Sequence, residues 1–448
     1  MDNTMKSVAF HNLGCKVNGY EMDYMQQNLQ ERGYIVVPFD TKADIYIINT
    51  CSVTNMADRK SRQMIHRAKK MNPDVQTSTE EVLQDLSIDI AIGNNRKKDL
   101  VEIIEEYLRR SEQEGESFTI EEKKSFSERN IIDINHTDEY EDMQLSHTAE
   151  HTRAFLKVQD GCNQFCSYCI IPYARGRIRY RAMEEILKEV RELTANGYQE
   201  IVLTGIHLSS YGMEKGNDFT KSRLGELIRA VNAVEGVRRI RLGSLEPRII
   251  TEEFAKELSQ CEKLCPHFHL SLQSGCDSVL QRMNRKYTTG EYYEKVEILR
   301  KFFDKPAITT DVIVGFPQET EEEFMQTVEF LKKIRFYETH IFKYSKRKGT
   351  PAAIMQGQIP EEVKSVRSDR LSELHAQNSH AFRESYIGKQ VEYLLEEEMV
   401  IDGVRYQTGY TREYIRIALK TQEDLSGTIQ KGVIREFLKP DILLVFSS

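Results

Sequence analysis

A repeated succession of strand, loop and helix between residues 151 and 377 limits the fold of this chain most strongly. The predicted strands cover residues 154–159, 200–204, 239–242, 267–271, 308–314 and 338–344. Apolar residues at helical spacing predict helices between them, near 183–196, 224–234, 252–261, 290–303 and 321–335. Six such βα units fit an open or partial barrel, whose site lies at the carboxyl ends of its strands.

Three cysteines follow the first of these predicted strands. Cys162, Cys166 and Cys169 lie within one short loop, separated by three residues and then by two. Thiolates are the ligands of iron–sulfur clusters, and three of them leave one iron of a four-iron cluster open to a substrate or cofactor. The alternative is a structural zinc site, but zinc normally takes four ligands arranged as Cys-x2-Cys pairs. The spacing therefore favours a cluster.

Residues 1–110 show a second alternation of strands and helices, which predicts an open α/β sheet. The predicted strands are 6–12, 43–49 and 89–93, and the predicted helices are 18–32, 56–71 and 98–109. No strand and no third cysteine is expected between residues 71 and 81. Cys15 and Cys51 follow the first two strands, where such sheets bind ligands. Two buried thiols are the alternative for this pair.

Residues 111–150 carry twelve acidic residues against three basic ones and few apolar residues, so they are interpreted as a flexible connector. The net charge of the chain is −8, and this connector accounts for all of it. A nucleic-acid partner is therefore not excluded. No apolar run is long enough to span a membrane, and no secretion signal is present, so we expect a cytoplasmic protein with reduced thiols.

Residues 378–448 change to short alternating strands, at 391–395, 404–408 and 414–418, which predict a small β-barrel. Tyrosines and arginines alternate in this region. Aromatic rings can stack on splayed RNA bases while arginines hold phosphates, so this face is a candidate RNA surface. The candidate residues are Arg405, Tyr410, Arg412, Tyr414 and Arg416. The alternative is an ordinary solvated sheet face.

Four arginines recur at every second position beside the cysteines, namely Arg175, Arg177, Arg179 and Arg181. They are interpreted either as contacts to the stem of an RNA hairpin or as partners of acidic residues such as Glu184 and Glu185, since exposed ion pairs are common.

Several motifs around these features resemble the radical SAM (S-adenosylmethionine) methylthiotransferase family. They are residues 12–18 and 49–51 in the first segment, and 203–206, 243–247, 269–275 and 311–317 after successive barrel strands. The resemblance covers nearly the whole chain, including the order of its parts. It implies an N-terminal methylthiotransferase domain, a radical SAM core and a C-terminal TRAM domain that binds RNA.

The resemblance also implies cofactors and ligands. Two [4Fe-4S] clusters and S-adenosyl-L-methionine are expected, with Cys162, Cys166 and Cys169 as the catalytic cluster's ligands. Cys15 and Cys51 match two ligands of the second cluster, and Gly205, Ser244 and Gln273 occupy loop positions suited to SAM contact. The family uses three cysteines in its first domain, whereas this chain has two there. We therefore expect a weakly held second cluster.

Residues 406–416 and 170–177 resemble the branch that modifies N6-threonylcarbamoyladenosine in tRNA. The implied reaction replaces the C2 hydrogen of that base, next to the anticodon, with a methylthio group. The expected partners are this tRNA and an electron donor such as flavodoxin or ferredoxin, with no membrane and no DNA. Two alternatives stay open: the branch acting on N6-isopentenyladenosine, and a non-catalytic tRNA-binding protein with a structural metal.

Overall fold

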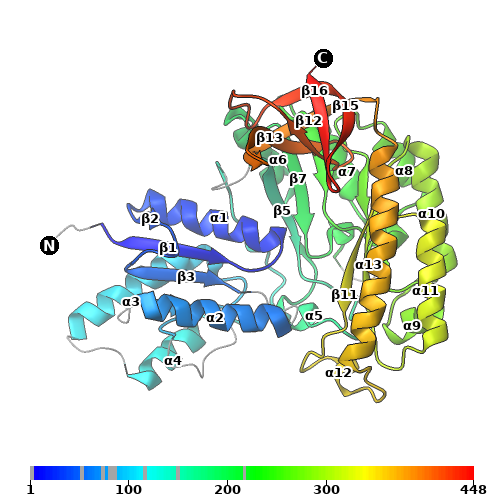
Figure 1. Ribbon diagram of the computed structural model, residues 1–448. Helices are drawn as coiled ribbons and strands as arrows, with labels where there is room; N and C mark the ends of the chain where they lie inside the picture. Colours follow the sequence, from blue (N-terminus) through cyan, green and yellow to red (C-terminus); the bar gives the residue numbers. More distant parts are fainter. Residues whose placement is uncertain are drawn as a thin grey trace.

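The computed structural model describes residues 5–50, 55–71, 76–78, 88–114, 119–147, 152–214 and 218–447. It consists of an N-terminal α/β part, a central partial barrel and a small C-terminal β-barrel (Figure 1). Among the described residues, none of the helices combines the length and apolar character that a membrane span requires.

The N-terminal part is a parallel sheet with strand order β2-β1-β3-β4. Its strands are β1 (Ser7–Asn12), β2 (Ile35–Val37), β3 (Ile45–Asn49) and β4 (Gln76–Ser78), and its helices are α1 (Lys16–Glu31), α2 (Asn55–Met71) and α3 (Leu100–Glu114). All of β3 is buried, as its isoleucine-rich sequence predicts.

Two predictions for this sheet were wrong. Residues 89–93 form no strand, although Ile90 and Ile92 pack into the core beside α3. The alternating apolar residues there belong to a buried segment without regular secondary structure. Conversely, β4 lies where no strand was expected, and it pairs in parallel with β3. Three residues are too few to show a period in the sequence.

The acidic connector is more ordered than its composition predicts. It contains α4 (Ile120–Arg129), which begins with a capping box between Thr119 and Glu122. Phe126 packs in the N-terminal core, and Met143 and Leu145 pack in the barrel core. The prediction of a flexible connector was therefore wrong for residues 119–147, because the segment's few apolar side chains are buried.

The central part confirms the predicted partial barrel. Strand order β6-β5-β7-β8 continues through single bridges between β8 and the β9 region into β9-β10-β11, and only β6 is antiparallel. The strands are β5 (Ala154–Asp160), β6 (Arg179–Tyr180), β7 (Glu200–Gly205), β8 (Arg239–Leu242), β9 (His267–His269), β10 (Ala307–Val314) and β11 (Glu338–Lys343). Strands β6 and β11 are the edges, so the barrel is open.

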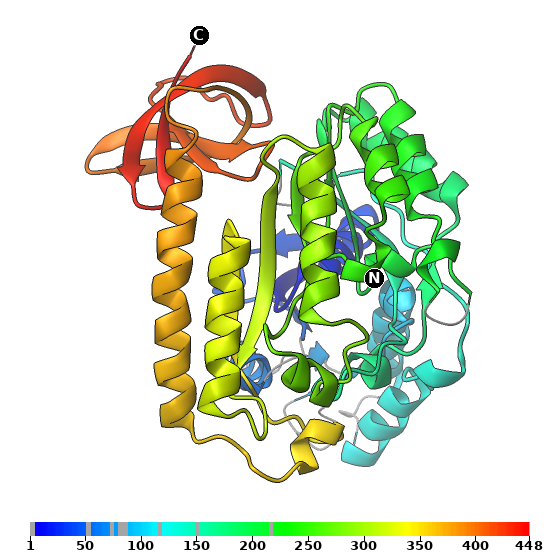
Figure 2. The same ribbon diagram turned by 90° about the vertical axis from the view of Figure 1, so that its right-hand side faces the viewer.

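Helices surround these strands, most of them on the outside, with the short α5 and α12 at one end of the core (Figure 1). They are α5 (Ile171–Ala174), α6 (Met183–Ala195), α7 (Leu224–Ala233), α8 (Glu252–Ser259), α9 (Asp277–Arg282), α10 (Thr289–Phe302), α11 (Glu321–Ile334), α12 (Pro351–Ile354) and α13 (Glu361–Glu384). Capping boxes start α10 and α11, which is why these two helices begin close to where the sequence predicts. Helix α13 runs along the core into the C-terminal barrel (Figure 2). The predicted boundary between residues 377 and 378 falls inside this helix.

The C-terminal part is a closed barrel of order β12-β13-β14-β16-β15. Its strands are β12 (Gln390–Ile401), β13 (Val404–Thr411), β14 (Arg416–Leu419), β15 (Ile429–Lys439) and β16 (Ile442–Ser447). It sits at the amino ends of the core strands, at the end of the core opposite to α5 (Figure 1). Arg239 and Arg241 at the start of β8 donate to the carbonyls of Tyr410, Thr411 and Arg412.

We expect Gly409→Ala to destabilise the C-terminal barrel by about 1–3 kcal/mol, because overpacking forces backbone shifts. A Cβ there would lie 1.9 Å from the carbonyl oxygen of Leu394 on β12. Gly290→Ala is the control, since its Cβ would meet only the Thr288 hydroxyl at 3.8 Å. Urea denaturation followed by circular dichroism measures both. Equal effects of the two substitutions would contradict the packing argument.

Candidate active site

The three predicted cluster cysteines lie in one tight loop after β5. Gly161 has φ +71°, and a Cβ there would lie 1.8 Å from the carbonyl oxygen of Arg177. Only glycine allows this approach. The amide of Cys162 donates to Gly176, and the amide of Cys169 donates to Cys166, both at 3.0 Å. These backbone contacts keep the loop compact, so all three thiols are carried by one short, tightly folded segment.

Residues at the end of α9 and directly after it form hydrogen bonds with this loop. The amide and hydroxyl of Ser167 donate to the carbonyls of Met283 and Arg282, and Asn284 donates to the carbonyl of Phe165. Arg285 donates to the sulfur of Cys166 at 3.3 Å and to the carboxylate of Glu246 at 3.1 Å. Sequence reasoning missed Arg285, because a single arginine after Met283 and Asn284 is not a distinctive signal, and it assigned no role to Glu246 within the motif 243–247.

The thiols fit a metal cluster with three protein ligands. Cys162 and Cys169 are partly exposed, whereas Cys166 is buried. Burial, followed by smaller effects of their neighbours, raises the pKa of Cys162 and of Cys169 to about 12. Both are therefore protonated at neutral pH without a metal, and cluster assembly must release protons. Three thiols on one loop match the donor chemistry of an iron–sulfur cluster with an open iron.

The predicted SAM-contact residues lie at the same end of the barrel as this loop. Gly205 ends β7, and a Cβ there would approach the Gln159 side chain to 2.9 Å. Ser244 follows β8 and is exposed. Gln273 follows β9 with a φ of +74° and is bridged to Val312.

Cys15 caps the start of α1 and is exposed, whereas Cys51 lies outside the described residues. Asn18 joins the residues that precede the two cysteines. Its side-chain amide donates to the carbonyl of Leu13 at 2.9 Å and to that of Thr50 at 3.0 Å. Thr50 directly precedes Cys51, so the loops after β1 and β3 lie side by side.

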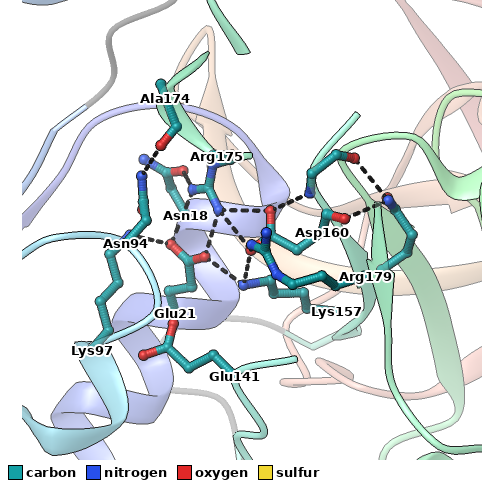
Figure 3. A network of polar contacts seen from close by, with 12 residues as sticks. Asn18, Glu21, Asn94, Lys97, Glu141, Lys157, Asp160, Ala174, Arg175 and Arg179 are labelled. Carbon is teal, nitrogen blue, oxygen red and sulfur yellow. Dashed lines mark hydrogen bonds and ion pairs between the residues drawn. The ribbon is translucent and has the colours of Figure 1, made fainter. Parts of the chain in front are cut away.

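A buried ion network connects these loops to the cysteine loop of the core (Figure 3). Glu21 on α1 pairs with Arg175 at 2.8 Å, Lys157 at 2.7 Å and Lys97 at 2.6 Å. Asp160, which precedes the cysteine loop, pairs with Lys157 at 2.7 Å and Arg175 at 3.3 Å. Burial opposes the charge of Glu21, but the three cations outweigh it and hold its pKa well below its usual range.

This network agrees with the interpretation of the alternating arginines as partners of acidic residues, although these acids are not Glu184 and Glu185. Arg175, Arg179 and Arg181 are buried, so they present no surface to RNA. Arg175 and Arg179 approach Asp160, and Arg181 pairs with Asp142 and Glu189 rather than with Glu184 or Glu185. Arg177 is exposed and lies 4.5 Å from the centroid of the Phe165 ring.

The candidate RNA residues divide into two groups. Tyr410 and Tyr414 stack at 4.5 Å with Arg153 of the core over both rings, and Arg412 donates to the carbonyls of Glu262 and Leu264. These three residues join the C-terminal barrel to the core. Arg405 and Arg416 instead pair with Glu398 and Glu397 on β12.

The barrel strands carry a group of polar side chains to which sequence reasoning assigned no role. His269, Asp311 and His340 come from β9, β10 and β11, and their side-chain ligand atoms lie within 4.8 Å of one another. Lys16, at the start of α1, lies 5.9 Å from the centroid of the Phe155 ring on β5. Burial, Arg153 and Arg241 lower the pKa of Lys16 to about 8.

We expect Arg175→Met to cost about 3–5 kcal/mol of stability, because it leaves Glu21 and Asp160 short of a buried partner. Arg177→Met, two residues away on the exposed side, should cost less than about 1 kcal/mol. Urea denaturation followed by circular dichroism compares the two. A loss at Arg177 as large as that at Arg175 would contradict the assigned role of the network.

Glu246 should make stability depend on acid pH. Burial opposes its charge, but Arg285, His207 and Arg248 lower its pKa to about 2. The stabilisation is therefore full above pH about 4.5, the usual glutamate range, and is lost as the pH falls toward 2. Unfolding measured at stepwise lower pH should show a steeper loss for the native protein than for Glu246→Gln. Parallel losses would rule out this carboxylate as a source.

Comparisons with known proteins agree with this geometry. Residues 156–331 match the radical SAM superfamily, and residues 7–82 match uncharacterized protein family UPF0004. Among solved structures, the radical S-adenosylmethionine methyltransferase TsrM from Kitasatospora setae, with cobalamin and a [4Fe-4S] cluster bound, aligns with a TM-score of 0.53 at 14% identity. The alignment covers 78% of this chain and 77% of that one. At this identity the likeness shows the fold alone.

Curated relatives are much more similar. Threonylcarbamoyladenosine tRNA methylthiotransferase MtaB of Bacillus subtilis is 41% identical over 95% of this chain and 93% of its own length. The protein of the same name from Aquifex aeolicus is 40% identical over 87% and 93%. The tRNA-2-methylthio-N(6)-dimethylallyladenosine synthase of Carboxydothermus hydrogenoformans is 34% identical over 94% and 95%. The chain therefore belongs to the radical SAM methylthiotransferase family.

Proposed function

We propose that this protein adds a methylthio group to C2 of N6-threonylcarbamoyladenosine beside the tRNA anticodon, in the cytoplasm. The observation that carries the substrate is the 41% identity, over 95% of the chain, to a relative named for this nucleoside. The relative named for the dimethylallyl nucleoside reaches 34% over a similar length.

In this proposal, Cys162, Cys166 and Cys169 hold a [4Fe-4S] cluster, which together with SAM supplies a 5′-deoxyadenosyl radical when bound. Arg285 orients Cys166 through its 3.3 Å hydrogen bond to the sulfur. Gly205, Ser244 and Gln273 are proposed to contact SAM from the loops at the same end of the barrel. An electron donor such as flavodoxin or ferredoxin completes the system.

We assign the supply of sulfur to residues 1–110, radical chemistry to residues 151–377 and RNA binding to residues 378–448, with 111–150 connecting the first two. Cys15 and Cys51 would ligate a second [4Fe-4S] cluster. The network around Glu21 supports this assignment, since it ties α1, which begins beside Cys15, to the loop of Cys162. Arg405 and Arg416 are the proposed phosphate contacts, because Tyr410, Arg412 and Tyr414 already contact the core.

The test is anaerobic reconstitution followed by reaction with SAM, a reductant and tRNA carrying N6-threonylcarbamoyladenosine, with mass spectrometry of the nucleosides. We expect the methylthio product from the native protein and none from Cys162→Ala, Cys166→Ala or Cys169→Ala. Product only from tRNA with the isopentenyl nucleoside would reassign the substrate. Bound zinc without sulfide would favour a non-catalytic RNA-binding protein.

The N-terminal cysteines lead to a separate expectation about metal content. With two cysteines where the family uses three, reconstituted protein should hold nearer four irons than eight, because a cluster with fewer thiolates is bound less tightly. Iron and sulfide assays on Cys162→Ala/Cys166→Ala/Cys169→Ala, which keeps Cys15 and Cys51, measure the second site alone. Four stable irons in that variant would refute the expectation.

A further inference from the structure

Lys16 is a cation inside the partial barrel, and no carboxylate of the described residues forms an ion pair with it. Helix α1 begins at this residue, and its ammonium lies 5.9 Å from the centroid of the Phe155 ring. No ion pair or hydrogen bond joins this ammonium to any residue that the structure describes. The side chain is partly exposed, so a ligand can reach it.

The neighbouring cations already have partners. Arg153 pairs with Glu396 at 2.7 Å, and Arg241 pairs with Glu200 at 2.7 Å. Of these three cations on this wall of the interior, Lys16 is therefore the one without an ion-pair partner among the described residues. An uncompensated positive charge in a partly enclosed space attracts an anion.

The facing wall carries two histidines and one carboxylate. His269 Nε2 lies 3.2 Å from Asp311 Oδ2, and the rings of His269 and His340 are 5.7 Å apart. His267 lies near both walls: burial lowers its pKa, and Arg241, Lys16, His269 and His340 lower it further. The interior thus suits a polar ligand with one anionic group at Lys16 and further hydrogen-bonding groups toward the histidines.

We propose that Lys16 binds the carboxylate of the threonylcarbamoyl group and thereby selects this nucleoside over those with a neutral N6 group. The inference rests on the proposed function. The threonylcarbamoyl group carries one carboxylate, and a dimethylallyl group carries none. A charge-assisted hydrogen bond stabilises the first substrate, whereas the second would cover the ammonium with apolar surface and leave it unpaired. Lys16 therefore favours one substrate and rejects the other.

The position of Lys16 is consistent with this role. It directly follows Cys15, and α1 packs beside β5, whose end leads into the loop of Cys162 (Figure 1). A carboxylate held at Lys16 would keep the modified base in the barrel, next to Cys15.

The experiment uses two anticodon stem-loop RNAs. One carries N6-threonylcarbamoyladenosine, and the other carries the same nucleoside with its carboxylate converted to the neutral methylamide. Native protein, Lys16→Met, Lys16→Arg and the control Lys301→Met are compared after reconstitution. Lys301 is an exposed lysine on α10 paired with Glu252. The measurements are kcat/KM for each RNA, equilibrium binding of each RNA without SAM, SAM affinity, and iron and sulfide content.

We expect native protein and Lys301→Met to prefer the carboxylate RNA by about ten- to hundredfold in kcat/KM, the range of one charge-assisted hydrogen bond. Lys16→Met should lower this ratio to near one through loss on the carboxylate RNA alone, with iron content and SAM affinity unchanged. Lys16→Arg should keep most of the preference. The binding ratios of the two RNAs should change in the same direction.

Three results would overturn the proposal. They are an undiminished carboxylate preference in Lys16→Met, an equal loss on both RNAs, and weaker SAM binding with the preference intact, which would assign Lys16 to the carboxylate of SAM. Failure of the proposed function is distinguishable, because native protein with its cluster intact would then modify neither RNA.

Discussion

The buried carboxylate of Glu21 holds the two thiol-bearing parts of this protein together. It accepts contacts from Arg175 and Lys157 of the core and from Lys97 of its own domain. Charges removed from water are tolerated only with close partners, and a missing partner costs several kcal/mol. The network therefore favours one placement of α1 against the barrel, and this placement brings the start of α1 to the open side of the barrel.

The first turns of α1 serve three purposes through different side chains. Lys16 enters the barrel interior, Asn18 joins the loops after β1 and β3, and Glu21 forms the contact with the core. Because successive side chains of a helix point in different directions, the start of one helix can contact the barrel interior, two neighbouring loops and the core. Cys15 lies at the N-cap of this helix, so its position depends on all three contacts.

Arginine in this chain is used mainly to join its parts. Arg239 and Arg241 reach backbone carbonyls of the C-terminal barrel, and Arg412 reaches back to carbonyls of the core. Arg175, Arg179 and Arg181 are buried near the cysteine loop. The guanidinium group suits this use, since its donors can satisfy several carbonyl or carboxylate oxygens at once. A count of basic residues along the sequence therefore overstates the surface available to RNA.

The sequence by itself determined the six βα units, the loop of three cysteines, the small terminal β-barrel and the family, because periodicity and motif spacing are local properties of the chain. The predictions were wrong about a strand at residues 89–93 and about the flexibility of the acidic connector, because packing overrides the local pattern there. They also missed β4, which is too short to show a pattern. Only the tertiary structure decided that Arg285 contacts Cys166, that Arg175 is buried against Glu21, and that Lys16 lies beside Phe155 without an ion pair to any described residue. These contacts join residues separated by more than a hundred positions, and the surroundings of each side chain depend on partners that no local pattern identifies.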